Sequence, residues 1–200
     1  NYGIGWEGDE GRSDVKSVCG DYPAVISFDL GHIELGDTMS LDKVPFTKIR
    51  KEILNQYKRG GMSSLSWHLR NPLTGGDSWD VSDTTVVKSI LPGGANHEKF
   101  TGWVSKVSAF INSLQTEEGV KVPVLFRPWH EHTGSWFWWG EKLCTPEEYK
   151  ALWHMTVDIL RNDGVDNALY AYSPGSEPQD TAQYLKRYPG DELIDLIGFD

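Results

Sequence analysis

An acidic residue and a group of large aromatic residues lie within one short segment of this sequence. Residues 127 to 140 read RPWHEHTGSWFWWG, with Glu131 between two histidines and aromatic residues at all positions from 136 to 139. A carboxylic acid can protonate the leaving oxygen of a glycosidic bond, and indole rings pack against the apolar faces of sugar rings. A single tryptophan is more often core than site. The combination indicates a cleft that binds and cleaves a sugar chain, with the four aromatic residues as its platform.

The residues before this segment predict where it lies. Residues 121–126 read KVPVLF, an apolar run with the composition of a buried strand. A helical pattern precedes it, with an apolar face formed by Phe100, Trp103, Val104, Val107, Ile111 and Leu114. Residues 127–132 are therefore expected just past the C-terminal end of a buried strand.

The same alternation of strand and helix recurs along the chain. Further strands are predicted at residues 24–28, 62–67, 168–172 and 193–199, with a short helical stretch between the last two. A helix is predicted at 45–58, with Phe46, Ile49, Ile53, Leu54 and Tyr57 facing inward. Another is predicted at 145–163, where Thr145 and Glu148 form a capping box.

Polar residues follow five different predicted strands. They are Asp29 and His32, then His68, then His130 and Glu131, then Ser173, and finally Asp200. A (β/α)8 barrel gathers such residues on the C-terminal face of its parallel sheet, whereas a doubly wound sheet concentrates them at one switch point. No glycine-rich phosphate fingerprint follows any strand, which disfavours nucleotide binding. The pattern predicts an α/β fold of the (β/α)8 TIM barrel type.

The number of strands predicts that only part of a barrel is present. A closed barrel has eight strands in about 250 residues, and this chain of 200 residues has five predicted strands. We expect residues 1–200 to form an incomplete (β/α)8 catalytic domain with about strands two to six, the first strand and strands seven and eight lying outside the sequence. Such a fragment has an unpaired sheet edge, so the isolated 200 residues are expected to be inactive and prone to aggregate.

Composition narrows the substrate. The net charge of -10 disfavours nucleic acid and acidic polymers as partners and leaves a neutral polysaccharide or oligosaccharide. Nine tryptophans and eight tyrosines suit stacking on sugars. The sequence contains no run of about 20 apolar residues that could span a membrane. We expect a monomer that is secreted or held in the cell envelope, without a cofactor; Cys19 and Cys144 could pair in an oxidising compartment.

Several motifs together resemble those of glycoside hydrolase family 26. They are RPWHEHTGSWFWWG and the following CTPEEYKALW, SWHLRNPLTGGDSW at 66–79, LPGG at 91–94 and YPGDELIDLIGFD at 188–200. The resemblance extends through essentially the whole chain. It implies a (β/α)8 barrel that cleaves internal β-1,4-mannosidic bonds of mannan, galactomannan or glucomannan by a retaining double displacement.

The resemblance also implies roles for individual residues. Glu131 matches the general acid/base after the fourth strand, and His130 matches the histidine beside the nucleophile. His68 matches a histidine that contacts the sugar at the cleavage site. Trp136 matches a tryptophan on the leaving-group side, and Trp79 is expected to contact substrate.

The family nucleophile, a second glutamate after the seventh strand, is expected beyond residue 200. Glu141, Glu177 and Glu192 are the nearest acidic residues, but none follows a strand at the required place. Arg127 is a candidate for keeping the nucleophile ionised, and a purely structural role is nearly as well supported.

Other interpretations remain open. His68, His130, Glu131 and His132 could be imagined as metal ligands, but HEH lacks the HExxH spacing that places two ligands on one helix face, so no metal is expected. His32 is a candidate for the rim of the cleft. A similar barrel could act on β-1,3-xylan or mixed-linkage β-glucan, and a non-catalytic carbohydrate-binding relative would keep the tryptophans without needing the acid.

Overall fold

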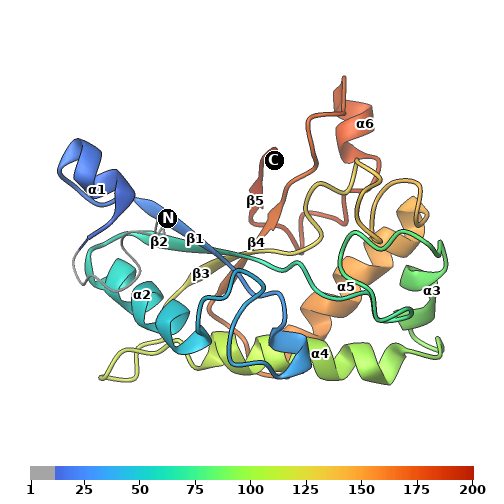
Figure 1. Cartoon of the computed structure of the whole chain (residues 1–200). Helices are drawn as coiled ribbons and strands as arrows, with labels where there is room; N and C mark the ends of the chain where they lie inside the picture. The colour runs from blue at the N-terminus through green and yellow to red at the C-terminus, as the bar shows by residue number, and fades with distance from the viewer. Residues whose placement is uncertain (1–11) are drawn as a thin grey trace.

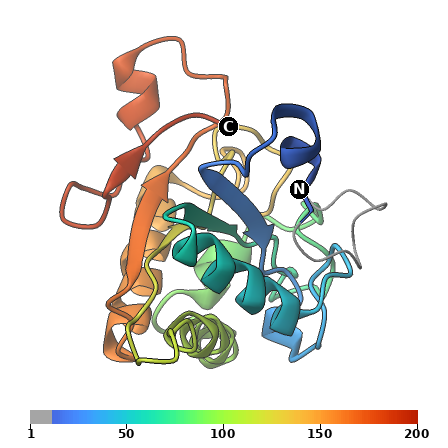
Figure 2. The same cartoon turned by 90° about the vertical axis from the view of Figure 1, so that its left-hand side faces the viewer.

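The centre of the fold is a parallel sheet of five strands. A computed structural model describes residues 12–200. The strands lie in the order β1-β2-β3-β4-β5, so each pairs with the next one along the chain. Their bounds are β1 Val25–Asp29, β2 Met62–Ser66, β3 Val124–Arg127, β4 Ala168–Tyr172 and β5 Leu196–Ile197. Figure 2 shows the sheet from blue β1 to red β5.

The long helices connect successive strands and lie on one side of the sheet (Figure 1). They are α2 Phe46–Lys58, α4 His97–Asn112 and α5 Pro146–Asn162. Shorter helical elements are α1 Asp14–Cys19, the 3-10 helix η2 Ile33–Leu35, α3 Val86–Ile90 and α6 Thr181–Leu185. No helix among residues 12–200 has both the length and the apolar character required to span a membrane.

The strand order distinguishes between the (β/α)8 barrel and the doubly wound sheet, the two folds that the alternation of strands and helices allowed. A doubly wound sheet reverses its strand order at a switch point and carries helices on both faces. Here the order of the five described strands runs without reversal, and the long helices lie together on one side. This is the arrangement of part of a (β/α)8 barrel. The predicted fold class is confirmed.

Helix α2 shows one error in the predicted core. Ile49 and Ile53 are buried as expected, but Tyr57 is 37% exposed. Gln56 takes the inward position instead, because its Nε2 donates to the carbonyl oxygens of Pro23 (2.8 Å) and Ala24 (3.1 Å). A polar side chain is buried here because it binds the backbone that leads into β1.

Helix α5 begins as its sequence predicts. The Thr145 hydroxyl accepts a hydrogen bond from the Glu148 backbone N–H (3.1 Å), and the Glu148 carboxylate accepts one from the Thr145 N–H (2.9 Å). Pro146 occupies the first turn, where its missing N–H costs nothing. This reciprocal cap fixes the point at which the chain leaves the loop that contains Glu131.

Several predicted strand limits are wrong in detail. Leu193 and Ile194 lie before β5 and not in it, and their side chains are buried. Arg127 is the last residue of β3 and does not follow it. The cysteines are unpaired in this structure, with Cys19 exposed and Cys144 buried.

Candidate active site at the C-terminal ends of the strands

The C-terminal ends of three neighbouring strands place three polar residues side by side. Asp29 ends β1 and pairs in register with Ser66, which ends β2. Ser66 in turn pairs with Arg127, which ends β3. Because parallel strands present their carboxyl ends at one edge of the sheet, the segments that follow them meet there. The predicted gathering of polar groups at this edge is confirmed for these strands.

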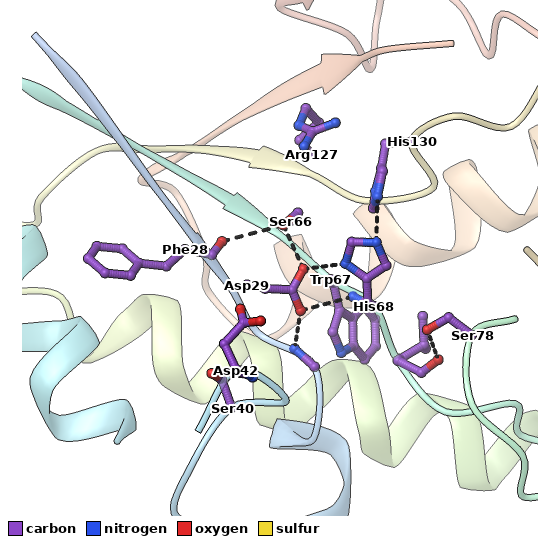
Figure 3. A network of polar contacts seen from close by, with 12 residues as sticks. Phe28, Asp29, Ser40, Asp42, Ser66, Trp67, His68, Ser78, Arg127 and His130 are labelled. Atoms are coloured by element: carbon purple, nitrogen blue, oxygen red, sulfur yellow. Dashed lines mark hydrogen bonds and ion pairs between the residues drawn. The ribbon is translucent and has the colours of Figure 1, made fainter. Parts of the chain in front are cut away.

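Asp29 accepts hydrogen bonds from several directions (Figure 3). Its Oδ2 accepts a hydrogen bond from Ser66 Oγ (2.6 Å) and lies 2.6 Å from His68 Nδ1. Its Oδ1 accepts hydrogen bonds from the backbone N–H groups of Gly31 (2.7 Å) and His68 (3.2 Å). Burial by itself would raise the pKa of Asp29, but the hydrogen bond to His68, the charge of that ring when it is protonated, and the other donors lower it. Asp29 is therefore a buried carboxylate that stays ionised.

His68 and His130 meet edge to edge above this carboxylate. Their Nε2 atoms are 3.0 Å apart, with ring centroids 4.5 Å apart. Burial, together with the charge of His68 when that ring is protonated and the charge of Arg127, lowers the pKa of His130 to about 3, so His130 is neutral near pH 7. The Trp79 ring stacks on His68 at 5.3 Å with an interplanar angle of 10°. The structure thus brings together three of the predicted site residues.

Glu131 stands in a backbone conformation that is unusual for its type. Its φ is 52° and that of Trp129 is 55°, both in the left-handed region. The side chains on either side of His130 consequently diverge, with Trp129 fully buried and Glu131 partly exposed. Glu131 Oε2 accepts a hydrogen bond from Trp136 Nε1 (2.7 Å).

Three hydrogen bonds from distant residues hold this strained stretch. Tyr149 OH donates to the carbonyl of Trp129 (2.6 Å), Trp139 Nε1 donates to the carbonyl of His130 (2.9 Å), and the N–H of Glu131 donates to the carbonyl of Ser173 (2.9 Å). Left-handed conformations of this kind persist only where the surroundings enforce them. The orientation of Glu131 is therefore set by α5, by the aromatic loop and by the end of β4.

The aromatic run divides into one exposed ring and three buried ones. Trp136 is 41% exposed, and its ring lies so close over Gly134 that a Cβ there would overlap it. Phe137, Trp138 and Trp139 are at most 3% exposed and belong to the core. The prediction of a four-residue sugar platform is thus wrong for these three, because the loop folds back and packs them against Trp129 and His130.

Arg127 binds groups at the ends of the next two strands. Its guanidinium forms an ion pair with Asp200 and donates to Ser173 Oγ (3.1 Å), while Ser173 Oγ donates to Asp200 (2.6 Å). Arg127 therefore links β3 to the ends of β4 and β5. Both predicted roles, supporting a nucleophile and bracing the structure, are compatible with this position.

A cleft of about 610 Å³ opens beside these residues. It runs along β1 and reaches Asp29, His68, Trp79 and Arg127 at the strand ends. His32, predicted at its rim, is not part of the lining; its Nδ1 lies 3.7 Å from Asp37. Among residues 12–200, no group of three or more His, Cys, Asp or Glu is placed to hold a metal ion, and His132 packs fully buried between Tyr149 and Tyr172.

Comparison with known proteins identifies the family. The model described as "Glycosyl hydrolase family 26" matches residues 6–200. The chain belongs to glycosyl hydrolase family 26. The resemblance read from the motifs is confirmed.

Relatives of this family 26 chain include named mannanases. It is 38% identical over 196 residues to a mannan endo-1,4-beta-mannosidase of Bifidobacterium adolescentis, covering 94% of this chain and 19% of that protein. It is 27% identical over 198 residues to the Bacillus subtilis enzyme of the same name, covering 93% and 52%. The solved structure of a family 26 β-mannanase from Bacteroides ovatus is 65% identical with a TM-score of 0.98, covering 100% of this chain and 58% of that one. The chain spans about half or less of the length of these two curated relatives.

Two buried charged residues of this family 26 chain were not predicted as part of the site. Glu34 is 1% exposed and accepts from Trp67 Nε1 (3.1 Å) and the Arg70 N–H (2.8 Å). Burial raises the pKa of Glu34. Because Trp67 and Arg70 flank His68 closely in sequence, Glu34 holds the segment that carries this histidine.

Arg187, 2% exposed, binds the loop that carries Glu131 and Trp136. Its guanidinium donates to the carbonyls of His132 (2.7 Å), Trp139 (3.1 Å), Gly140 (3.4 Å) and Cys144 (2.9 Å), and to Cys144 Sγ (2.8 Å). It also stacks on the Tyr149 ring, 4.3 Å from the centroid. Arg187 closes the loop by joining its two ends.

Acid should destabilise this fold through its buried histidines. Burial lowers the pKa of His130 to about 3 and holds that of His132 well below its usual value, whereas both should titrate near 6.5 when unfolded. Between about pH 6.5 and 3 the unfolded chain therefore binds more protons than the folded chain. The free energy of unfolding consequently falls as the pH falls, by up to about 1.4 kcal/mol per pH unit for each of the two rings. Denaturant unfolding at a series of pH values measures this slope.

Two variants identify the source of the slope. His132→Gln should make it shallower, whereas His154→Gln, which changes an exposed histidine of α5, should leave it unchanged. A stability that is flat between pH 6.5 and 4 in the unsubstituted protein would contradict the assignment.

Proposed function

We propose that the protein is an endo-β-1,4-mannanase that cleaves mannan, galactomannan or glucomannan with retention of configuration. The observation that carries the proposal is Glu131, which lies past the C-terminal end of β3 with its carboxyl group held by Trp136 Nε1 at 2.7 Å. The cleft, whose lining includes His68 and Trp79 but not Glu131, reaches the same edge of the sheet. Membership in family 26 and mannanases among the relatives support this choice of substrate.

In the proposed mechanism Glu131 acts twice. As the acid it protonates the leaving oxygen while a second carboxylate attacks the sugar, and as the base it then activates the water that releases the product. Retention requires the two carboxyl groups to lie about 5 to 5.5 Å apart. A partly exposed carboxyl group, fixed by one indole N–H, can both reach the leaving group and exchange its proton.

The second carboxylate is proposed to be a glutamate beyond residue 200. The three acidic residues considered from the sequence each face another partner. Glu141 pairs with Lys186 (3.0 Å), Glu177 accepts from Thr133 Oγ1 (2.6 Å), and Glu192 lies 3.9 Å from His154. None of these contacts directs a carboxylate toward Glu131.

Substrate choice is tested by assaying the full-length protein on mannan, glucomannan, xylan and lichenan. We expect the highest kcat/KM on mannan or glucomannan and a mixture of oligosaccharides early in the reaction, since the enzyme cleaves internal bonds. Higher activity on β-1,3-xylan or lichenan would replace mannan with the alternative substrates, and binding without hydrolysis would favour a carbohydrate-binding relative.

We also propose that the protein is a monomer that is secreted or held in the cell envelope, where polymers are accessible. Light scattering tests the monomer, and cell fractionation tests the location.

Trp136 is expected to contribute to binding. Replacing Trp136 with alanine should weaken substrate capture by about 1 to 3 kcal/mol if a sugar ring packs on the indole, the range for burying a large apolar side chain. Because Trp136 is 41% exposed, the fold should survive. Calorimetric titration of a mannooligosaccharide measures the loss.

The variant Trp136→Phe separates the two contacts of this residue. Phenylalanine keeps an aromatic face but cannot donate to Glu131, so affinity should remain close to normal while kcat falls. Loss of cooperative unfolding in Trp136→Ala would mean that the residue is part of the core and not a binding surface.

A further inference from the structure

Every polar contact of Asp29 described in the site comes from a group that can donate a hydrogen bond. The hydroxyl of Ser66, the N–H of Gly31 and the N–H of His68 approach its two oxygens, and His68 Nδ1 lies 2.6 Å from Oδ2. An ionised carboxylate only accepts. His68 must therefore carry a proton on Nδ1, and the short distance is that of a charge-assisted hydrogen bond.

The Nε2 atom of His68 contacts His130, so the position of the proton on His68 also determines the position of the proton on His130. The two Nε2 atoms are 3.0 Å apart, a separation that requires one proton between them. In a neutral His68 whose proton is on Nδ1, Nε2 has a lone pair and can only accept. The Nε2 atom of His130 must then be the donor, which leaves Nδ1 of His130 without a proton.

We propose that His68 is neutral, and that Asp29 is a positioning residue that fixes His68 as the Nδ1–H tautomer and, through it, His130 as the Nε2–H tautomer. The chain of contacts from Asp29 to His68 and on to His130 is visible in Figure 3. Its catalytic consequence rests on the proposed function, since His130 adjoins Glu131 and His68 lines the cleft. A reversed pair of tautomers would exchange donors for acceptors beside the reacting sugar.

The surroundings of Asp29 predict what an amide at this position would do. In Asp29→Asn, the two backbone N–H groups that bind Oδ1 would retain the amide oxygen there. A Cβ on Gly31 would lie only 2.9 Å from Asp29 Oδ1 and 2.6 Å from the His68 carbonyl, which shows how little room remains for rearrangement. The NH2 group would then face His68 Nδ1 and donate to it. Both histidines should switch to the opposite tautomer.

Nitrogen-15 NMR of the full-length protein, labelled in its histidines, reads these tautomers directly. The spectra are recorded without substrate near pH 8.5, and the two rings are assigned from signals lost in His68→Gln and His130→Gln. We expect protonated Nδ1 in His68 and protonated Nε2 in His130. Asp29→Asn should reverse both patterns, whereas Ser66→Ala, which removes another donor to the same oxygen but keeps the charge, should preserve them.

Kinetics provide the second measurement. Asp29→Asn should lower kcat/KM on mannan by about 10- to 100-fold. This is less than the roughly 10⁴-fold loss of kcat known where the histidine in the wrong tautomer is itself the catalytic base, because the proposed acid/base here is Glu131. Retained cooperative unfolding of the variant would exclude general loss of structure as the cause.

The outcomes separate this inference from the proposed function. An unprotonated Nδ1 of His68 in the unsubstituted protein would overturn the role of Asp29, and this measurement remains decisive even if Asp29→Asn fails to fold. A His68 protonated on both nitrogens, or a His130 protonated on Nδ1, would overturn the transmission to His130. Identical tautomers in the unsubstituted protein and a folded Asp29→Asn variant would also overturn the proposal. Expected tautomers in a protein that does not cleave mannan would instead reject only the proposed function.

Discussion

Replacing Glu131 with alanine should slow hydrolysis of mannan by about 10²- to 10⁴-fold, the usual contribution of a general acid or base. The loss on an activated aryl glycoside should be smaller for the first step, because its leaving group needs little protonation. Azide should partly restore turnover of that substrate, since it can attack the glycosyl intermediate without a base. Steady-state kinetics on both substrates, with and without azide, measure these effects in the full-length protein.

Glu141→Gln is the matched control for this experiment. Glu141 belongs to the same loop, but its carboxylate pairs with Lys186 at the surface, so this substitution should leave kcat within about threefold on both substrates, as expected for a surface pair. Equal and modest losses on polymer and aryl glycoside in Glu131→Ala would exclude Glu131 from the acid role.

Replacing Arg187 with alanine should destabilise the protein by at least about 3 kcal/mol. The substitution leaves the buried carbonyls of the Glu131 loop without their donor, and each unsatisfied buried acceptor costs about 1 to 3 kcal/mol. For a domain of this size the melting temperature should fall by about 2 to 4 °C per kcal/mol. Activity should fall as well, because the guanidinium joins the two ends of the loop that positions Glu131. Thermal unfolding followed by circular dichroism measures the change.

The neighbouring residue provides the control. Lys186 is exposed and pairs with Glu141 at the surface, so Lys186→Ala should cost no more than about 1 kcal/mol. A similar small loss in Arg187→Ala would mean that water or a rearranged loop satisfies the carbonyls, and that Arg187 does not hold the loop.

The long elements of the fold were predictable because burial alone decides them. The apolar faces of α4 and α5 have a helical period over at least four turns, and β3 and β4 are largely apolar runs. Short elements are too short to show such a period: α3 has five residues, α1 has six and η2 has three. Tyr57 was predicted to be buried at the position that Gln56 takes. Hydropathy could not predict this, because it takes no account of the two carbonyl groups of residues 23 and 24 that bind the Gln56 side chain.

The candidate site was predictable only where its chemistry lies in one segment. Glu131 and Trp136 were found from six residues of local sequence, and the structure joins them by a hydrogen bond. The same reasoning assigned Phe137, Trp138 and Trp139 to a sugar platform, because composition does not show which way a folded loop turns its rings. Asp29 was noticed at a strand end but received no role, since its partner His68 is 39 residues away.

The left-handed backbone at Trp129 and Glu131 limits how this motif can be transplanted. An engineer who copied only residues 127–140 into another barrel would omit the hydroxyl of Tyr149 and the carbonyl of Ser173, which hold the strained peptides from outside the segment. In the new host the chain would relax toward right-handed conformations, and the carboxyl group would turn away from Trp136 Nε1. A useful graft therefore includes the first turn of α5 and the end of β4. Glycine at position 131 would relieve the left-handed backbone, but it would also remove the carboxyl group that the graft is meant to supply.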